Sequence, residues 1–304
     1  MSPNPFDQAC RYLAKIAPLA ILCWLLKLTP DQLAFRRWLD TRLLRFPGEP
    51  DRTCDTVAHV EDLKAGGVPW VQVLEFQIAP DPLMFGRLLG YFGPLWVEYK
   101  PAPERGDRFS LGGIVVNLTS AGRSSQSMDW PATGQHTGLT LVERNLAAES
   151  AADTLQAIAA GTAPAVILPW IPLMSGGADA EVIAEWKRLA ERETDPRLKS
   201  DLGGLALVFS EAAGHLAVWK EALKEWNMIQ SKQVLEWQAQ ARSETQVTTL
   251  SRSVMRVLEA RFGNVPPDLS DRVRAVSDAA ALDQLLVAAA RSPSLEEFLR
   301  SWSN

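Results

Sequence analysis

The sequence predicts an α/β fold, in which a mixed sheet flanked by helices is followed by an all-helical C-terminal region. Short apolar runs bounded by turn residues, at 52–60, 71–77 and 111–119, are typical of buried strands. From Ala178 onward, apolar residues recur at helical spacing. We therefore expect an α/β domain over 1–175, a helical linker region over 176–244 and a small helical domain over 245–304.

Composition limits the classes of function. The chain has 304 residues, 47% of them hydrophobic, so it can bury a sizeable core. A net charge of -5 argues against a strongly basic nucleic-acid coat but leaves room for a local basic groove. Three cysteines without ligand spacing, Cys10, Cys23 and Cys54, favour free thiols in a reducing cytoplasm.

The N-terminal segment predicts a helix over 5–27, either continuous or bent near Pro18. Its apolar run, Ile16–Leu26, has eleven residues, which is too short to span a bilayer, and it lacks the cleavage site of a signal peptide. We therefore expect no membrane association. Asp7 lies in the first turn, where it either complements the helix dipole or belongs to a functional site.

A second helix is predicted from Thr29 to about Leu44, with Thr29 as its cap and Pro30 at its first position. It carries several arginines that are candidates for phosphate contact. These are Arg36, Arg37, Arg42 and Arg45. A solvated helix face explains the same arginines equally well.

Two carboxylates mark the next pair of strands. Asp55 lies near the start of the first strand and Glu75 near the end of the second, and the glycine turn at 64–69 predicts an antiparallel hairpin that brings them together. Side chains alternate along a strand, so Glu75 and Gln77 share a face. One Asp and one Glu on neighbouring strands form the hard oxygen site that Mg²⁺ prefers. His59 falls on the Asp55 face, where it either approaches the site or packs within the sheet.

The third helix is predicted to begin at Pro82, capped by Asp81, and to run to about Val97. Arg87 and Tyr91 lie four residues apart on one face, so Arg87 either reaches a phosphate or pairs with a carboxylate. Beyond the strand at 111–119 we expect a loop over 120–137, a short strand at 139–143 and an extended apolar piece at 165–174.

The C-terminal half predicts helices near 178–193, 195–211, 213–243, 245–262, 267–280 and 294–302. The 213–243 helix carries an apolar stripe that includes Trp219 and Trp237. Core packing explains this stripe; the alternative is a homodimer seam with near-heptad spacing.

The Asp55–Glu75 pair can carry metal-dependent phosphodiester hydrolysis; the alternative is a chance occurrence, since an Asp and a Glu-x-Gln on strands are common. A divalent cation polarises the phosphoryl oxygen and lowers the pKa of a bound water. The third group, two residues after the glutamate, is usually a lysine; Gln77 can orient water but carries no positive charge. The sequence contains no Gly-rich phosphate loop, no Gly-x-Ser-x-Gly motif and no zinc-ligand spacing.

The order of these motifs along the chain resembles that of the Rpn-type recombination-promoting nucleases, or YhgA-like transposases, of the PD-(D/E)XK nuclease superfamily. The segments that carry the resemblance are Pro5–Leu13, Cys54–Val57, Leu74–Gln77, Asp81–Tyr91, Leu258–Gly263 and Ser294–Leu299. The resemblance implies a restriction-endonuclease-like core and a bound Mg²⁺ or Mn²⁺, with Asp55, Glu75 and the Phe76 carbonyl as ligands. It also implies DNA as partner, and catalysis by Asp55, Glu75 and Gln77.

Two hypotheses follow: a Mg²⁺-dependent DNA endonuclease linked to recombination or transposition, or a catalytically weak or inactive nuclease-fold protein that binds DNA or assembles with partners. A cation held between Asp55 and Glu75 favours the first. Carboxylates that diverge, or that Arg87 neutralises, favour the second. If DNA binds, we expect salt-sensitive contacts from Arg36, Arg37, Arg42 or Arg87, with Asp7 and Tyr91 in supporting roles.

Overall fold

The computed structural model describes residues 4–41, 45–46, 49–101, 108–224, 226 and 232–302. The chain forms two compact units, Met1–Trp237 and Gln238–Asn304. Each unit has its own hydrophobic core, and the carboxylate pair belongs to the first unit.

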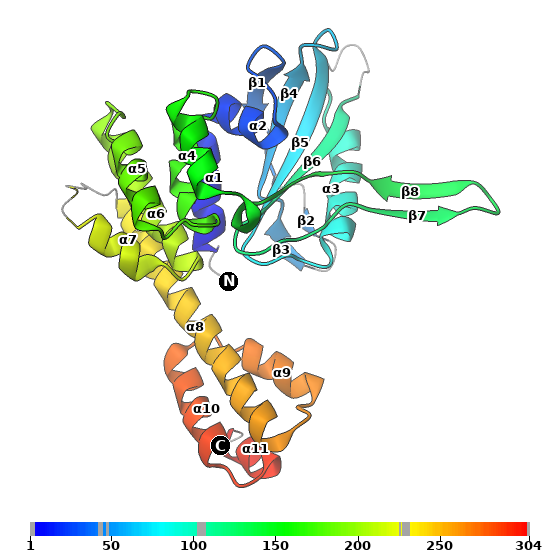
Figure 1. The fold of residues 1–304 in the computed structure, drawn as a ribbon. Helices are drawn as coiled ribbons and strands as arrows, with labels where there is room; N and C mark the ends of the chain where they lie inside the picture. Colours follow the sequence, from blue (N-terminus) through cyan, green and yellow to red (C-terminus); the bar gives the residue numbers. More distant parts are fainter. Residues whose placement is uncertain are drawn as a thin grey trace. The chain divides into compact units, whose positions relative to one another are not determined.

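A five-stranded mixed sheet forms the centre of the first unit (Figure 1). Its strands are β1 (Leu33–Trp38), β4 (Thr56–Asp62), β5 (Val68–Gln77), β6 (Ser110–Asn117) and β9 (Val142–Asn145), in the spatial order β1-β4-β5-β6-β9. The β4 strand is antiparallel to both of its neighbours, whereas β5, β6 and β9 are parallel to one another. The predicted α/β class is therefore confirmed, and so is the antiparallel pairing of the two strands that follow Asp55 and contain Glu75.

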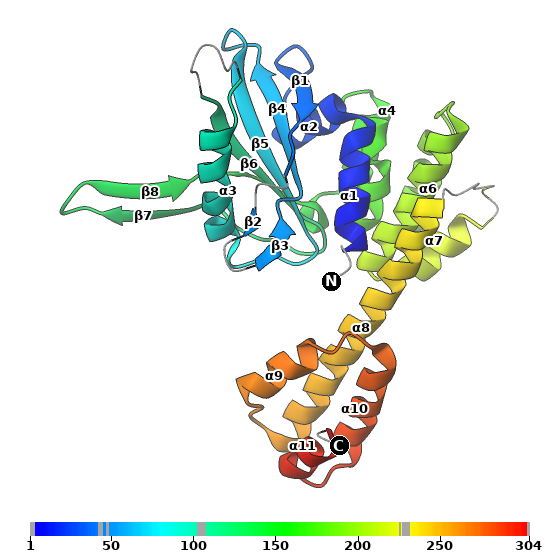
Figure 2. The ribbon, with the colours of Figure 1, turned by 180° about the vertical axis from the view of Figure 1, so that it is seen from behind.

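Helices cover both faces of this sheet (Figures 1 and 2). The α3 helix (Met84–Glu98) packs on one face, where its apolar side meets residues of β4, β5 and β6. The other face is covered by α1 (Pro5–Ile16) and α2 (Pro18–Leu26). The alternation of side chains along β5 sends Val71 and Val73 into the α3 core, so Glu75 and Gln77 also face α3.

The bent form of the N-terminal helix is confirmed. The α1 helix ends at Ile16 and α2 begins at Pro18, and the two axes differ by 107°. Proline has no N–H to donate and is suited to the first position of a new helix. Among the described residues, no single helix is long and apolar enough to cross a membrane; α1 and α2 meet the criteria only when they are counted together.

The helix predicted over Thr29–Leu44 is wrong. The chain turns after Lys27, whose φ of 56° ends α2, and then forms β1. Leu33 pairs with Asp62 and Phe35 with Val60, so β1 completes one edge of the sheet. Aromatic side chains favour strands, and sheet pairing here overrides a helical charge pattern.

The segment predicted as a loop over 120–137 contains a hairpin. Its strands are β7 (Gln126–Trp130) and β8 (Gln135–Leu139), which pair only with each other. Figure 1 shows this hairpin as an arm that extends away from the sheet. The strand predicted at 139–143 is instead divided between the end of β8 and β9. A further pair, β2 (Arg45–Phe46) and β3 (Glu49–Thr53), precedes Asp55.

The rest of the first unit is helical. Its elements are η2 (Leu146–Ala148), α4 (Ala151–Ala159), η3 (Ala165–Leu173), α5 (Ala180–Ala190), α6 (Pro196–Ala212) and α7 (Leu216–Ala222). The extended piece predicted at 165–174 is wrong, because 3₁₀ turns form around Pro169 and Pro172. These prolines remove backbone donors that a sheet would need.

The single helix predicted over 213–243 is also wrong. The α7 helix ends at Ala222, and α8 runs over Lys232–Phe262. Trp219 is fully buried, donates from Nε1 to the Gly177 carbonyl at 3.0 Å and stacks edge-on against Trp186. Trp237 is buried as well and donates to Gln8 Oε1 at 3.0 Å. Trp219 and Trp237 of the apolar stripe therefore pack in the core of their own chain.

The second unit contains most of α8, followed by α9 (Pro267–Arg274), α10 (Ala279–Arg291) and α11 (Leu295–Trp302). The helix predicted near 267–280 is therefore shorter than expected, and α10 was not predicted. The core of this unit consists of Val254, Leu258, Leu269, Val273, Leu282, Leu285, Ala289 and Phe298.

Candidate functional site

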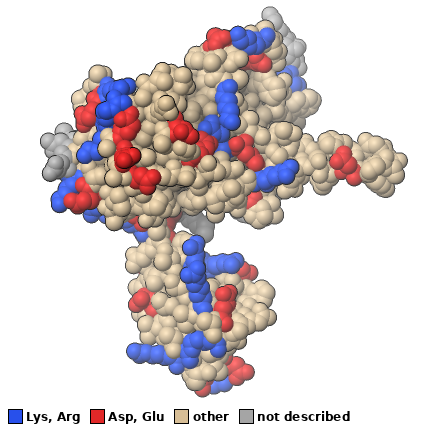
Figure 3. Space-filling view, in the orientation of Figure 1, with Lys and Arg blue, Asp and Glu red and all other residues tan. Residues whose placement is uncertain are grey.

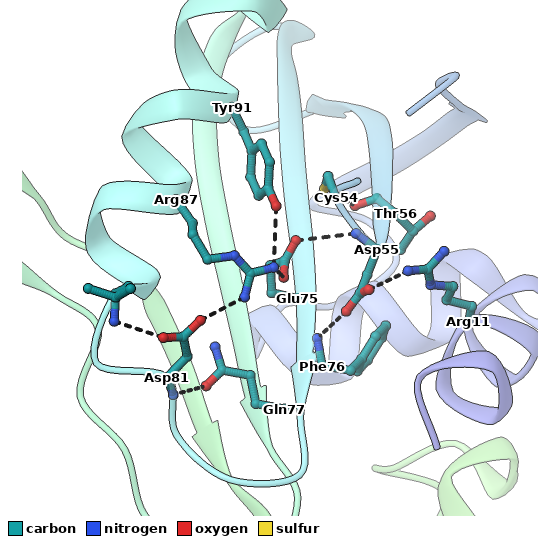
Figure 4. Close-up of polar contacts among 11 residues, drawn as sticks. Arg11, Cys54, Asp55, Thr56, Glu75, Phe76, Gln77, Asp81, Arg87 and Tyr91 are labelled. Carbon is teal, nitrogen blue, oxygen red and sulfur yellow. Dashed lines mark hydrogen bonds and ion pairs between the residues drawn. The ribbon is translucent and has the colours of Figure 1, made fainter. Parts of the chain in front are cut away.

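Asp55 and Glu75 meet at the point where β4 begins and β5 nears its end. Asp55 is 8% exposed and Glu75 is 1% exposed. The Asp55 N–H donates to Glu75 Oε1 at 3.2 Å, and the Phe76 N–H donates to Asp55 Oδ2 at 2.8 Å (Figure 4). Because β4 begins only at Thr56, opposite Leu74, the Asp55 side chain takes the place of a strand partner for Phe76.

An arginine engages each carboxylate. Arg87 donates from Nη2 to Glu75 Oε2 at 2.8 Å and from Nη1 to Asp81 Oδ2 at 2.9 Å. The same Nη2 lies 3.3 Å from the Tyr91 oxygen, one turn further along α3. Arg11 of α1 forms an ion pair with Asp55 Oδ1 from the opposite face of the sheet. Of the two roles predicted for Arg87, the structure therefore shows the contact with a carboxylate.

Gln77 is the last residue of β5, and its amide is held in place. Its Oε1 accepts the Asp81 N–H at 2.8 Å. Its Nε2 is buried and has no hydrogen-bond partner among the residues that the structure describes. Asp81 also accepts the Leu83 N–H at 2.8 Å, so the turn between β5 and α3 fixes both Gln77 and Arg87.

Burial dominates the electrostatics of the pair. It raises the pKa of Glu75, and the charge of Asp55 acts in the same direction, while Arg87 opposes both. Burial also raises the pKa of the Cys54 thiol and, with help from Glu75, raises the pKa of Tyr91 to about 12. Cys54 and Tyr91 are therefore protonated near neutral pH and are poor candidates for an ionised nucleophile.

The oxygen atoms of this site are of the type that a hard cation such as Mg²⁺ prefers. Asp55 and Glu75 supply carboxylate oxygens, and the Phe76 carbonyl points to the same side of β5 as its N–H, toward Asp55. Mg²⁺ is commonly bound by one or two carboxylates and completes its shell with water. The described residues contain no group of three His, Cys, Asp or Glu side chains placed to hold a metal. Both carboxylates are already paired, Asp55 with Arg11 and Glu75 with Arg87, so a partly hydrated Mg²⁺ would bind here only if one of these arginines released its carboxylate.

The other predicted site residues lie around or away from this pair. Asp7 is one turn before Arg11 on α1; burial lowers the pKa of Arg11, but Asp55 and, more weakly, Asp7 outweigh that effect and raise it. Arg36 of β1 is exposed and pairs with Glu61. Arg37 lies opposite His59 in the sheet, and Arg42 is outside the described residues.

His59 lies inside β4, opposite Val71, rather than beside the carboxylates. It is 8% exposed and contacts Phe109 edge-on, with ring centroids 4.7 Å apart. Neither ring nitrogen has a hydrogen-bond partner within the described part of the chain. Of the two predicted roles, packing within the sheet is the one that the structure shows.

The sequence does not predict two contacts of this network: Arg11 pairs with Asp55, and Asp81 pairs with Arg87. The sequence pattern places Asp81 at a helix start and Arg11 within a segment that carries the family resemblance. The one available indication was the spacing of Asp7 and Arg11, four residues apart on one helix face.

Comparison with known proteins gives no information about the family or function of this chain. The chain matches no family model, no curated protein and no solved structure. The residues around Asp55 and Glu75 therefore carry the functional assignment.

Proposed function

We propose that the protein is a Mg²⁺- or Mn²⁺-dependent DNA endonuclease linked to recombination or transposition, with Asp55 and Glu75 holding the metal. One observation carries this proposal: two buried carboxylates, joined by the Asp55 N–H···Glu75 hydrogen bond, meet at the ends of adjacent strands. The mixed sheet with helices on both faces supports the resemblance to a restriction-endonuclease-like core.

The surrounding residues have separate roles in this proposal. When bound, the cation supplies Lewis acidity and lowers the pKa of a bound water. The Gln77 amide, fixed by Asp81, presents Nε2 as a donor that orients that water. Arg87 contacts both Glu75 and Asp81; released from Glu75 and still held by Asp81, its guanidinium would supply the positive charge that a glutamine lacks.

A second candidate is a catalytically weak or inactive nuclease-fold protein that binds DNA or assembles with partners. The contacts of Arg87 with Glu75 and of Arg11 with Asp55 favour it, because both carboxylates already have a cationic partner. In this case the ion pairs hold α1 and α3 on the sheet. DNA or another partner then binds elsewhere on the surface.

Plasmid nicking separates the two candidates. Purified protein is incubated with supercoiled DNA and Mg²⁺ or Mn²⁺, beside the isosteric variants Asp55→Asn and Glu75→Gln and the control Glu98→Gln, which changes an exposed carboxylate on α3. We expect nicking by the wild type and the control, and none by the two site variants or with a chelator. Absence of nicking by folded wild type would support the second candidate, and nicking that survives both substitutions would exclude this pair.

A further inference from the structure

The second unit contains a groove in which three arginines converge. Two of them, Arg252 and Arg256, lie on α8, and Arg274 comes from the last turn of α9. The groove is completed by Val247, Thr248, Ser251, Met255 and Glu259. On the face shown in Figure 3, a band of basic side chains crosses this unit, with acidic side chains beside it.

These three arginines are available to a ligand. All three are exposed, and none forms an ion pair, hydrogen bond or ring contact with the residues that the structure describes. Two other arginines of the unit are engaged, since Arg261 donates to the Ala289 carbonyl and Arg272 stacks over Trp302. What distinguishes the groove is that three exposed arginines from two helices line the same space.

Arg252 and Arg256 are four residues apart on α8, so their positive charges repel each other unless an anion binds between them. Like charges four residues apart on one helix face repel each other by a few tenths of a kcal/mol. Arg274 adds a third positive charge from another helix, and Glu259 is the single carboxylate in the groove, which leaves a net charge of +2 among its lining residues. The whole chain has a net charge of -5, so this groove is a local reversal of sign.

We propose that the groove of Arg252, Arg256 and Arg274 binds the phosphate backbone of a nucleic acid. The guanidinium group matches two phosphate oxygens at once, and the hydroxyls of Thr248 and Ser251 are further phosphate donors on the same side of α8. Arg252 and Arg256 are separated by about 6 Å along the helix axis. A row of donors along a helix suits successive backbone phosphates better than one isolated anion.

This inference rests on the proposal that DNA is the partner, and it gives that partner a contact surface. Arg36 is paired with Glu61, and Arg87 is buried beside Glu75, so neither is an exposed, unpaired cation. The C-terminal unit then holds the nucleic acid by its backbone, without reading its sequence.

The test is DNA binding by the full chain, measured by fluorescence anisotropy with a labelled duplex in a chelator, which removes any dependence on catalysis. The groove variant combines Arg252→Gln, Arg256→Gln and Arg274→Gln. The control combines Arg242→Gln, Arg291→Gln and Arg300→Gln, which changes the net charge equally outside the groove. Affinity is measured from about 50 to about 200 mM salt.

We expect the groove variant to lose at least about tenfold in affinity at low salt. The slope of log affinity against log salt concentration should also be smaller in magnitude by about 2.7, because three phosphate contacts at about 0.9 each are lost. The control should keep the wild-type affinity and slope. Equal losses in both variants would show an effect of net charge alone and would overturn the inference. Displacement of DNA by polyglutamate as effectively as by unlabelled DNA would overturn it too, because the groove would then take any polyanion.

Two further results keep this test separate from the nicking assay. If the triple variant loses its helical circular dichroism, single substitutions replace it, and each should lower the slope by about 0.9. A wild type that binds DNA through the groove without nicking it would uphold the inference while refuting the endonuclease. A wild type that nicks DNA, beside a groove variant with unchanged binding, would refute only the groove.

Discussion

At the scale of single residues, the molecule buries a network of opposite charges where β4 meets β5. Asp55 contacts Arg11, while Glu75 and Asp81 both contact Arg87. The side chains of Asp55, Glu75 and Arg87 are buried, each with at most 8% of its surface exposed. Burying such charges is costly unless each one has a partner. Arg11 and Arg87 therefore supply the partners that these carboxylates need.

The buried pair should be far more sensitive to mutation than a surface pair of the same chemistry. We expect Arg87→Met to lower the free energy of unfolding by about 3–5 kcal/mol, because it leaves Glu75 buried without its cation. Arg36→Met, which breaks the exposed contact with Glu61, should cost less than about 1 kcal/mol. Urea denaturation measures both.

Added Mg²⁺ makes this comparison informative about function. If the carboxylates accept a metal, Mg²⁺ should restore part of the stability of Arg87→Met and leave that of Arg36→Met unchanged. Equal responses of the two variants to Mg²⁺ would contradict a metal site at Glu75.

His59 should make stability depend on pH. Burial lowers its pKa from the ordinary value near 6.5, and Arg37 across the strand acts in the same direction. The unfolded chain then binds more protons than the native state below that value, so stability should fall as the pH drops from about 7.5 to about 5.

A leucine at position 59 has no group to protonate. We expect His59→Leu to lose this part of the pH dependence, and His136→Gln, in the exposed hairpin, to keep it. Denaturation curves at several pH values test this expectation. A wild-type slope that persists in His59→Leu would assign the dependence to another group.

The carboxylate pair was predictable from the sequence, and so was a carboxylate as one of two alternatives for Arg87, whereas the contact of Arg11 with Asp55 was not. Strand alternation and one glycine turn fix where Asp55 and Glu75 lie relative to each other. Arg11 is separated from Asp55 by 44 positions and reaches it only through the packing of α1 on the sheet. Sequence spacing carries no information about such a contact.

At the scale of elements, the errors of prediction lie where tertiary structure competes with a local pattern. The charged segment after Thr29 satisfies helix rules, but its backbone completes the ladder beside β4. The polar run after Ser124 has no buried face, so no hydrophobic alternation marks β7 and β8. The three central strands β4, β5 and β6, which have several buried residues each, were predicted as strands.

The β7–β8 hairpin should contribute little to stability, because Met128 and Trp130 are more than half exposed. Ser127 lies opposite Gly138, so replacing residues 128–137 by Asn-Gly leaves a two-residue turn of the kind that hairpins favour. We expect the melting temperature to change by less than about 2 °C. A larger loss would mean that the arm packs against another part of the protein.

Leu141→Ala provides the comparison for that deletion. Leu141 packs against the core between the sheet and α3, and this variant should therefore lower the melting temperature by at least about 4 °C. Comparing the melting temperatures of the two variants distinguishes the contribution of the hairpin from that of Leu141, which follows it in the sequence.

At the scale of the whole molecule, each compact unit has a hydrophobic core of its own among the residues that the structure describes. In the first unit a cluster lies between the sheet and α3, and in the second unit the core is formed by α8 to α11. A unit as small as Gln238–Asn304 gains only about 3–5 kcal/mol from its core. The two units should therefore differ in how easily a single substitution unfolds them.

Phe298 is the test of that difference, because it is fully buried in the core of the second unit. Replacing a buried Phe by Ala costs about 3–5 kcal/mol, which equals the whole stability expected of a unit of this size. We therefore expect Phe298→Ala to unfold α9, α10 and α11, seen as loss of hydrogen-exchange protection there, while β4 and β5 stay protected. Val287→Ala, at an exposed position of α10, should leave both regions protected. Loss of protection in β4 and β5 together with α9–α11 would show that the chain unfolds as one cooperative body, because the local defect would then have spread through both cores.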